Sequence, residues 1–293
     1  MNPTIMHINY GETSFNSYGS NTIDKICRFA ANIGFDGIEF RGNPPKDLAD
    51  LSFEDYVAQV AAAKAKYNLP HILFSIAIEN IFSEDKELRA AGVAKALAKA
   101  QLVHEQCGTV LCNTASATVR STDPTVGNRD FARHGSAVAT QDHWDMYVEG
   151  YQQLAKGLEP MGMKFAFETH MNYIHDLPEA SKKLVDLIDS PSIGINMDYG
   201  NTVYFAGCPT VEEAIDIYGD KLFYTHLKNS VAAAGDRTPT ALSEGAINHR
   251  IYLEKLQSVG FAGPIGIEAP RPGDRFWFAQ QDLAYYNAIR ASL

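Results

Sequence analysis

Short apolar segments alternate with helix-like segments along the whole chain, and this alternation restricts the fold more than any other feature. Eight apolar segments, each ending in polar residues, begin at Thr4, Phe35, His71, Thr109, Met163, Ser192, Leu222 and Pro264. Between them lie segments of helical period, several of which end at a Gly that can cap a helix. Strands that alternate with helices favour right-handed crossovers and a parallel sheet. Eight such units close most naturally into a single (β/α)₈ barrel of the TIM type.

The regular spacing extends over residues 1–293 without a linker, so we expect one domain. The exception is the connection after the fourth strand, about residues 115–145, which has no helical periodicity. A loop of this length in a compact domain usually serves function, as a lid does, and an oligomer contact is the alternative. An open doubly wound sheet is the alternative fold, but no G-x-G-x-x-G follows the first strand.

Charge and composition exclude several classes of partner. The net charge is -10, from 35 acidic and 25 basic residues, and no Lys/Arg cluster interrupts it. We therefore expect neither a nucleic acid nor an anionic membrane as a partner. No apolar run approaches the roughly 20 residues of a membrane span, and the first residues lack the pattern of a signal peptide. The four cysteines show no C-x-x-C spacing, which favours reduced thiols in a cytoplasmic protein. Aromatic residues at 276–278 and 284–289 favour a homo-oligomer.

Four acidic or imidazole side chains fall on equivalent faces of the last four strands. Residues two apart in a strand share a face, so Phe165 and Phe167 lie opposite Glu168 in the segment MKFAFETH. By the same alternation Asp198, His226 and Glu268 point toward the barrel axis near the carboxyl ends of their strands. One such residue alone is more often part of a salt bridge or a hydrogen-bonded core. Three converging carboxylates would repel one another, so the set of four predicts a bound cation.

The predicted metal ligands are therefore Glu168, Asp198, His226 and Glu268. Hard oxygen donors without a thiolate suit Mn²⁺ or Mg²⁺; Co²⁺ also suits them, and Zn²⁺ is less favoured. Four protein ligands leave about two positions on an octahedral ion. The neighbouring oxygens of a hydroxy-ketone can fill those positions.

The strand ends also resemble a known family. The segments FETH, NMDYGN, THLKNS and GIEA close the last four strands, and GIEFRG and SEGAIN occur elsewhere in the chain. In these segments the chain resembles the xylose-isomerase-like barrels, which include ketose 3-epimerases, inosose dehydratases and isomerases, 3-dehydroshikimate dehydratases and AP endonucleases. The resemblance implies that the same four residues bind one divalent cation, and that Glu168 and Glu268 act as acid and base. Arg237 matches a substrate-binding arginine of the epimerase branch.

One position departs from the family pattern. The family often has D-x-x-H at the end of the sixth strand, and here the sequence DYGN places Asn201 where that histidine would be. Multi-metal endonucleases use the histidine, so its absence disfavours DNA repair. Asn201 can donate a hydrogen bond to a substrate oxygen, but it cannot transfer protons near neutral pH.

From these features we expect a divalent-metal-dependent isomerase or epimerase of a sugar or sugar acid, which acts through an enediolate. Its substrate would be a small sugar, polyol or keto-acid. The alternative is a dehydratase, because ETH-x-N also resembles the 3-dehydroshikimate dehydratases, and a non-catalytic sugar-binding barrel is the third class.

Several further polar residues are expected near the site. The expected substrate contacts are His7, Glu39, Arg41, His170, Asn201, Lys228 and Arg237. Arg271 and Arg275, just past Glu268, either reach a substrate anion or cap the barrel rim. The sequence predicts no functional role for His175.

Overall fold

The computed structural model describes residues 4–7, 22–44, 48–233, 236–268, 271 and 273–293. Within these residues each of the eight apolar segments forms a strand, and the strands follow the closed-barrel order β1-β10-β7-β6-β5-β4-β3-β2. The bounds are β1 Thr4–His7, β2 Gly37–Arg41, β3 His71–Ser75, β4 Leu111–Thr114, β5 Lys164–Glu168, β6 Ile193–Asp198, β7 Leu222–Leu227 and β10 Ile265–Glu268. The predicted barrel is therefore confirmed, and the open sheet is wrong.

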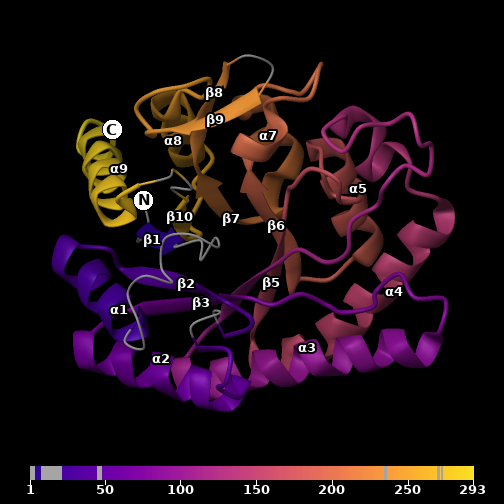
Figure 1. The fold of residues 1–293 in the computed structure, drawn as a ribbon, viewed down its shortest axis with the longest axis horizontal. Coiled ribbons are helices and arrows are strands. Elements are labelled where there is room, and N and C mark those ends of the chain that lie inside the picture. The colour runs from indigo at the N-terminus through magenta and orange to yellow at the C-terminus, as the bar shows by residue number, and fades with distance from the viewer. Residues whose placement is uncertain (1–3, 8–21, 45–47, 234–235, 269–270, 272) are drawn as a thin grey trace. The chain divides into compact units, whose positions relative to one another are not determined.

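Helices separate the strands along the chain (Figure 1). They are α1 Thr22–Ile33, α2 Phe53–Tyr67, α3 Lys86–Cys107, α4 Gln141–Leu158, α5 Pro178–Ile188, α6 Tyr199–Thr202, α7 Val211–Tyr218, α8 His249–Ser258 and α9 Arg275–Arg290. Gly34 and Gly108 follow α1 and α3 at φ +93° and +64°, which confirms the predicted glycine caps. None of the helices in the described residues has the length and apolar character needed to cross a lipid bilayer.

The chain's contacts group it into two compact units. The central unit comprises residues 76–101 and 110–224 and contains the parallel strands β4, β5 and β6. Behind β5, Tyr147 and Tyr151 stack with ring centroids 4.6 Å apart, and the Phe167 ring meets Tyr151 edge-on at 6.2 Å. Phe165 and Phe167 are fully buried, as the alternation in β5 predicts.

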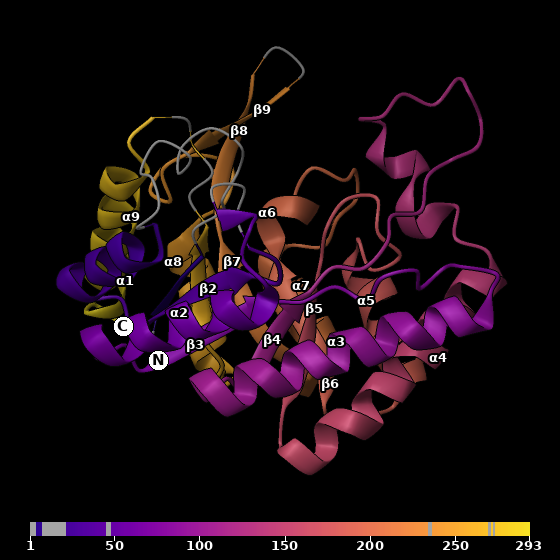
Figure 2. The ribbon, with the colours of Figure 1, turned by 60° about the horizontal axis from the view of Figure 1, so that its bottom comes forward.

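The terminal unit comprises residues 1–75, 102–109 and 225–293. In it β3, β2, β1, β10 and the end of β7 pair in parallel. Phe40, Tyr56 and Phe74 form an aromatic cluster with centroids 5.9–6.3 Å apart. An antiparallel pair, β8 Asn229–Ala233 and β9 Asp236–Thr240, follows β7 (Figure 2). The single domain over residues 1–293 stays a prediction.

The long connection after β4 was expected at about residues 115–145, and in the structure α4 begins at Gln141. Two short 3-10 helices, η3 Phe131–Arg133 and η4 Gly135–Ala137, lie within it. The connection is joined to the segment after β5, because the Val119 amide donates to the Asn172 carbonyl at 2.7 Å. The Ser136 amide also donates to Oδ2 of Asp176 at 3.2 Å. Burial raises the pKa of Asp176 to about 6, although its hydrogen bonds with Ser136 oppose this shift.

Candidate functional site

Glu168 ends β5, and side-chain amides hold both of its carboxylate oxygens. Asn113 on β4 donates from Nδ2 to Oε2 at 3.0 Å, and Asn201 in α6 donates from Nδ2 to Oε1 at 3.2 Å. The Glu168 side chain lies on the inward face of β5, and the residue is only 9% exposed. The predicted orientation of Glu168 is supported by these two inward contacts within the central unit.

Asp198 ends β6, and its backbone is locked to the end of β5. The Asp198 amide donates to Oγ1 of Thr169 at 2.8 Å, and the Thr169 amide donates to the Asn196 carbonyl at 3.0 Å. Asp198 and Thr169 are both fully buried. Further down β6, the Phe223 ring fills the space that a Cβ at Gly194 would need. A small residue on this face is what the alternation predicts.

His226 on β7 is paired with Glu39 on β2, within the terminal unit. Nε2 of His226 lies 3.0 Å from Oε2 of Glu39, and both side chains are fully buried. Because a carboxylate only accepts hydrogen bonds, Nε2 carries the proton and Nδ1 is left as the electron-pair donor. Carboxylates that hold a metal-binding histidine in this way are common in metalloproteins. Glu39 was predicted to contact the substrate, and the structure places it against His226.

Glu268 ends β10 beside a cation. Nζ of Lys228 donates to Oε2 of Glu268 at 2.8 Å, with the two side chains 12% and 7% exposed. His7 lies at the end of β1, where its backbone is in register with both Glu268 and Glu39. The strand ends of the terminal unit therefore carry three of the residues predicted to contact substrate, His7, Glu39 and Lys228, together with the two predicted ligands His226 and Glu268.

The other predicted contacts lie on β9 or near the ends of β2 and β5. Half-buried His170 follows β5, and its Nδ1 lies 3.0 Å from the Met171 carbonyl. Arg41 is half-buried at the end of β2, and Arg237 is half-buried on β9.

The two late arginines differ in their partners. Arg271 pairs with Asp282 at 2.6 Å and lies over the Phe278 ring at 4.4 Å. Arg275 begins α9 and is about half-buried. Burial lowers the pKa of Arg275, and the negative charge of Glu268 opposes this shift. Arg275 thus lies within electrostatic range of a predicted ligand.

The structure adds Asn113, Asn196 and the environment of His175, for which the sequence predicts no role. Asn113 and Asn196 are buried on inward faces, and their only signal was an amide at an inward position of an apolar strand. His175 is fully buried among aromatic rings, with Phe167 at 5.0 Å and Tyr173 at 5.3 Å. Burial lowers the pKa of His175 to about 3, so this imidazole is neutral at physiological pH.

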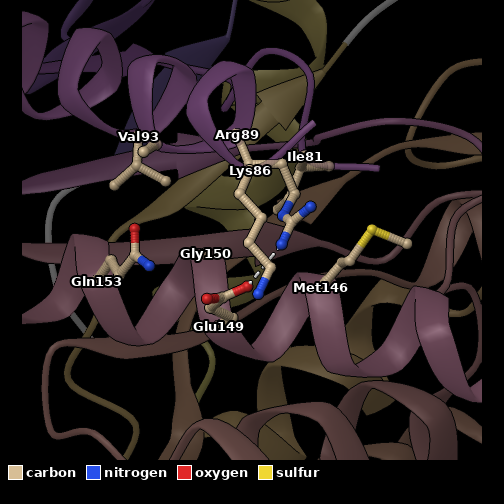
Figure 3. A pocket seen from close by; sticks show the side chains of 9 residues that line it. Ile81, Lys86, Arg89, Val93, Met146, Glu149, Gly150 and Gln153 are labelled. Atoms are coloured by element: carbon tan, nitrogen blue, oxygen red, sulfur yellow. Dashed lines mark hydrogen bonds and ion pairs between the residues drawn. The ribbon is translucent and has the colours of Figure 1, made fainter. Parts of the chain in front are cut away.

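A shallow pocket between α3 and α4 lies in the central unit but has no role in this site (Figure 3). Arg89 crosses it to Glu149, with Nη2 3.0 Å from Oε2, and also donates to the Ser83 carbonyl at 2.8 Å. Its cavity volume of about 20 Å³ leaves room for little more than one water molecule.

Glu168, Asp198, His226 and Glu268 form a cluster of donor side chains that could bind a metal ion. Three carboxylates and one imidazole, without a thiolate, match the preferences of a hard or borderline divalent cation. His226 fits this role because Glu39 holds its Nε2 and leaves Nδ1 as the ligand atom. These four side chains therefore fit the divalent cation that the sequence predicts.

Comparison with known proteins gives distant relatives that span the chain. An inosose dehydratase from Glaesserella parasuis serovar 5 (strain SH0165) is 21% identical over 289 residues, which cover 92% of this chain and 90% of the relative. A D-allulose 3-epimerase from Methylomonas sp. superposes with a TM-score of 0.74 at 17% identity, over 98% of this chain and 97% of that chain.

A second solved structure is a xylose isomerase-like TIM barrel protein from Mycobacterium smegmatis in complex with magnesium. It superposes with a TM-score of 0.76 at 18% identity and covers 99% of this chain and 97% of its own. At identities of 17% and 18%, both superpositions show a shared fold and nothing about activity. The family model described as "Xylose isomerase-like TIM barrel" matches residues 27–290. Because the match extends over nearly the whole sequence and agrees with the strand-end motifs, the chain belongs to the xylose isomerase-like TIM barrel family.

Proposed function

We propose that the protein is a divalent-metal-dependent isomerase or epimerase of a sugar or sugar acid, which acts through an enediolate. The observation that carries this proposal is the cluster of Glu168, Asp198, His226 and Glu268. Its support lies in the hydrogen-bonded partners of three of these side chains. Carboxylates and imidazoles arranged in this way are costly to build without a cation to neutralise them.

The donor set favours Mn²⁺ or Mg²⁺ over Co²⁺, with Zn²⁺ least favoured. A divalent cation held there would polarise a substrate carbonyl and offset the negative charge that develops when the neighbouring C–H bond is broken. Glu168 and Glu268 are the proposed acid and base. In epimerisation one carboxylate removes the proton and the other returns it to the opposite face of the same carbon. In isomerisation the proton returns to the adjacent carbon, while a hydroxyl proton moves to the former carbonyl oxygen.

The proposed substrate is a small polyhydroxy ketone, and its contacts are proposed from the strand ends. His7, Arg41, His170 and Arg237 are the residues that we assign to substrate contact. We assign Glu39 to His226 instead, because the pair is buried and 3.0 Å apart. We also propose that the protein forms a homo-oligomer.

A dehydratase is the second candidate, and two observations favour it. The relative that aligns with 92% of this chain is named an inosose dehydratase. In addition, Nζ of Lys228 lies 2.8 Å from Glu268, so an ammonium group stands beside the proposed base. After Glu268 or Glu168 removes the α-proton, Lys228 can donate a proton to a departing β-hydroxyl group, which leaves as water.

Isotope exchange tests the shared first step. The protein is incubated in D₂O with Mn²⁺ and a panel of ketoses, inososes and keto-acids, and deuterium at the carbon next to the carbonyl is measured by NMR. We expect exchange on at least one substrate, and we expect Glu168→Gln to abolish it. Glu79→Gln is the matched control, because Glu79 is an exposed side chain paired with Lys95. Absence of exchange and of product across the panel would refute the proposed function.

Product analysis separates the two candidates. An epimerase or isomerase gives an isomer of the substrate in which one hydrogen is replaced by deuterium, so no water has been lost and the mass changes only by the isotope. A dehydratase gives a product lighter by one water molecule, with an ultraviolet absorption from the new conjugated carbonyl. The second outcome would replace the isomerase proposal with a lyase and leave the metal site intact.

A further inference from the structure

Two neutral amides hold the carboxylate of Glu168, one of the predicted ligands. Asn113 donates to its Oε2 at 3.0 Å, and Asn201 donates to its Oε1 at 3.2 Å. Asn113 is 1% exposed and Asn201 is 2% exposed. Hydrogen bonds in such a low-dielectric surrounding restrict the side chain more strongly than they would in water.

The Asn113 amide can present only its nitrogen to Glu168. Its oxygen Oδ1 accepts from the Thr114 backbone amide at 2.9 Å and from Nδ2 of Asn196 at 3.1 Å. Because a backbone N–H is only a donor, the atom that faces it must be the amide oxygen. The NH₂ group of Asn113 therefore points to Glu168, and a chain of donors runs from β6 through β4 to the end of β5.

The Asn201 amide is fixed in the same way by a different neighbour. Its Nδ2 also donates to the backbone carbonyl of Thr169 at 3.0 Å. A carbonyl oxygen only accepts, so the nitrogen must lie between Thr169 and Glu168. Asn201 stands where the family often has a histidine, and its amide nitrogen is used by these two protein acceptors.

We propose that Asn113 and Asn201 are positioning residues that hold the Glu168 carboxylate ready for a divalent cation, and that Asn201 serves this ligand instead of the substrate. The inference rests on the proposed metal site. Partners behind a metal ligand set its orientation and its affinity for the ion. The two amides come from β4 and from α6, so they restrain the carboxylate from two sides.

Metal affinity, measured without any substrate, tests this proposal. The full chain is stripped with a chelator, and Mn²⁺ binding is followed by isothermal titration calorimetry. We expect Asn113→Ala and Asn201→Ala each to weaken Mn²⁺ binding by about 10–100-fold, the range found for partners behind metal ligands. Asn113→Ser and Asn201→Ser provide the same test if either Ala variant fails to fold, because a serine hydroxyl is too short to reach Glu168.

Thr109→Ala is the matched structural control. Thr109 is a buried residue whose Oγ1 donates to the Ile72 carbonyl at 2.8 Å, and it precedes β4 at the end opposite to the predicted ligands. This change removes one buried hydrogen bond, so it should lower stability and leave Mn²⁺ affinity unchanged. Equal losses of Mn²⁺ affinity in Thr109→Ala and the two asparagine variants would overturn the proposal.

A double-mutant cycle distinguishes positioning from general destabilisation. In a Glu168→Ala background the asparagines have no carboxylate to hold, so Asn201→Ala should cause no additional loss of Mn²⁺ affinity. A full additional loss would overturn the inference, as would single variants that bind like the wild type. In both cases the wild type still binds Mn²⁺ and the proposed function stands. A wild type that binds no divalent cation would overturn both.

Discussion

Nε2 of His226 lies 3.0 Å from Oε2 of Glu39, and neither side chain is exposed to solvent. The pair joins β7 to β2, although the two residues are 187 positions apart in the sequence. A buried carboxylate in this position fixes the tautomer and the ring orientation of the imidazole. The relationship makes Glu39 part of the support of a predicted metal ligand.

Glu39→Gln and Glu39→Ala should weaken Mn²⁺ binding. The Ala variant leaves the imidazole without its carboxylate, so we expect a loss of about 10–100-fold in affinity. The Gln variant retains a hydrogen-bond acceptor without the charge, so its loss should be smaller. Calorimetric titration of the chelator-treated protein measures both, with Glu79→Gln as an exposed control. An Ala variant that binds like the wild type would contradict the role assigned to Glu39.

Lys228→Met should separate metal affinity from turnover. The ammonium group lies 2.8 Å from Oε2 of Glu268, so it competes electrostatically with a bound cation. Removing this positive charge should tighten Mn²⁺ binding several-fold. The same change should lower turnover if Lys228 donates a proton to the substrate.

Lys95→Met is the control for the lysine change, because Lys95 pairs with Glu79 on the exposed surface. Affinity is read by titration with Mn²⁺, and turnover is read on the substrate that the isotope-exchange panel identifies. Weaker Mn²⁺ binding in Lys228→Met would show that the lysine supports the Glu268 carboxylate instead of competing with the ion.

Gly135→Ala should detach the connection between β4 and α4. Gly135 has φ +59°, and a Cβ there would collide with the Asp176 carboxylate and lie 2.7 Å from the Tyr173 carbonyl. We expect a cost of about 1–3 kcal/mol from the unfavourable backbone conformation, with further strain from the collision. The measurement is the rate of limited proteolysis within residues 115–140, which should rise. Gly127→Ala is the matched control, because open space surrounds position 127 in the same connection.

The buried His175 should make stability fall as the solution is acidified. Burial lowers its pKa from the ordinary 6.5 to about 3. The unfolded chain therefore binds a proton that the folded chain excludes, so this contribution is complete above pH 6.5 and is lost as pH falls toward 3. When the pH is lowered from 7 to 5, we expect the protonation of His175 in the unfolded chain to reduce the unfolding free energy by about 2 kcal/mol.

Urea unfolding of His175→Phe at both pH values measures this term, because the aromatic replacement suits the surrounding rings and does not titrate. Its unfolding free energy should fall less than that of the wild type. Asp176 acts in the opposite sense: its pKa is raised to about 6, so below that pH its protonation favours the folded state. Comparing the two proteins cancels the Asp176 contribution.

The sequence predicted the strands and their faces well, and it predicted their lateral neighbours poorly. Alternation places Glu168 on the inward face without any knowledge of register. The contact from Asn113 to Glu168 spans 55 positions, and that from Asn196 to Asn113 spans 83. Such contacts depend on how strands are staggered, which alternation within one strand does not specify.

The antiparallel pair β8 and β9 escaped prediction for a local reason. Its strands contain alanines and Pro239, which have weak strand propensity, and Pro239 lies opposite Ser230. Tertiary contacts of Asn229 compensate for the weak strand propensity. Nδ2 of Asn229 donates to the carbonyls of Leu242 and Ile247 at 3.2 and 2.8 Å.

Asn113 and Glu39, which hold Glu168 and His226, are both carried on strands, namely β4 and β2. Surface segments can therefore diverge in length and chemistry during evolution while these supports keep their places. We expect residues 115–140 to tolerate exchange with the corresponding segment of a relative. Such chimeras would provide a route to altered selectivity without rebuilding the reactive centre.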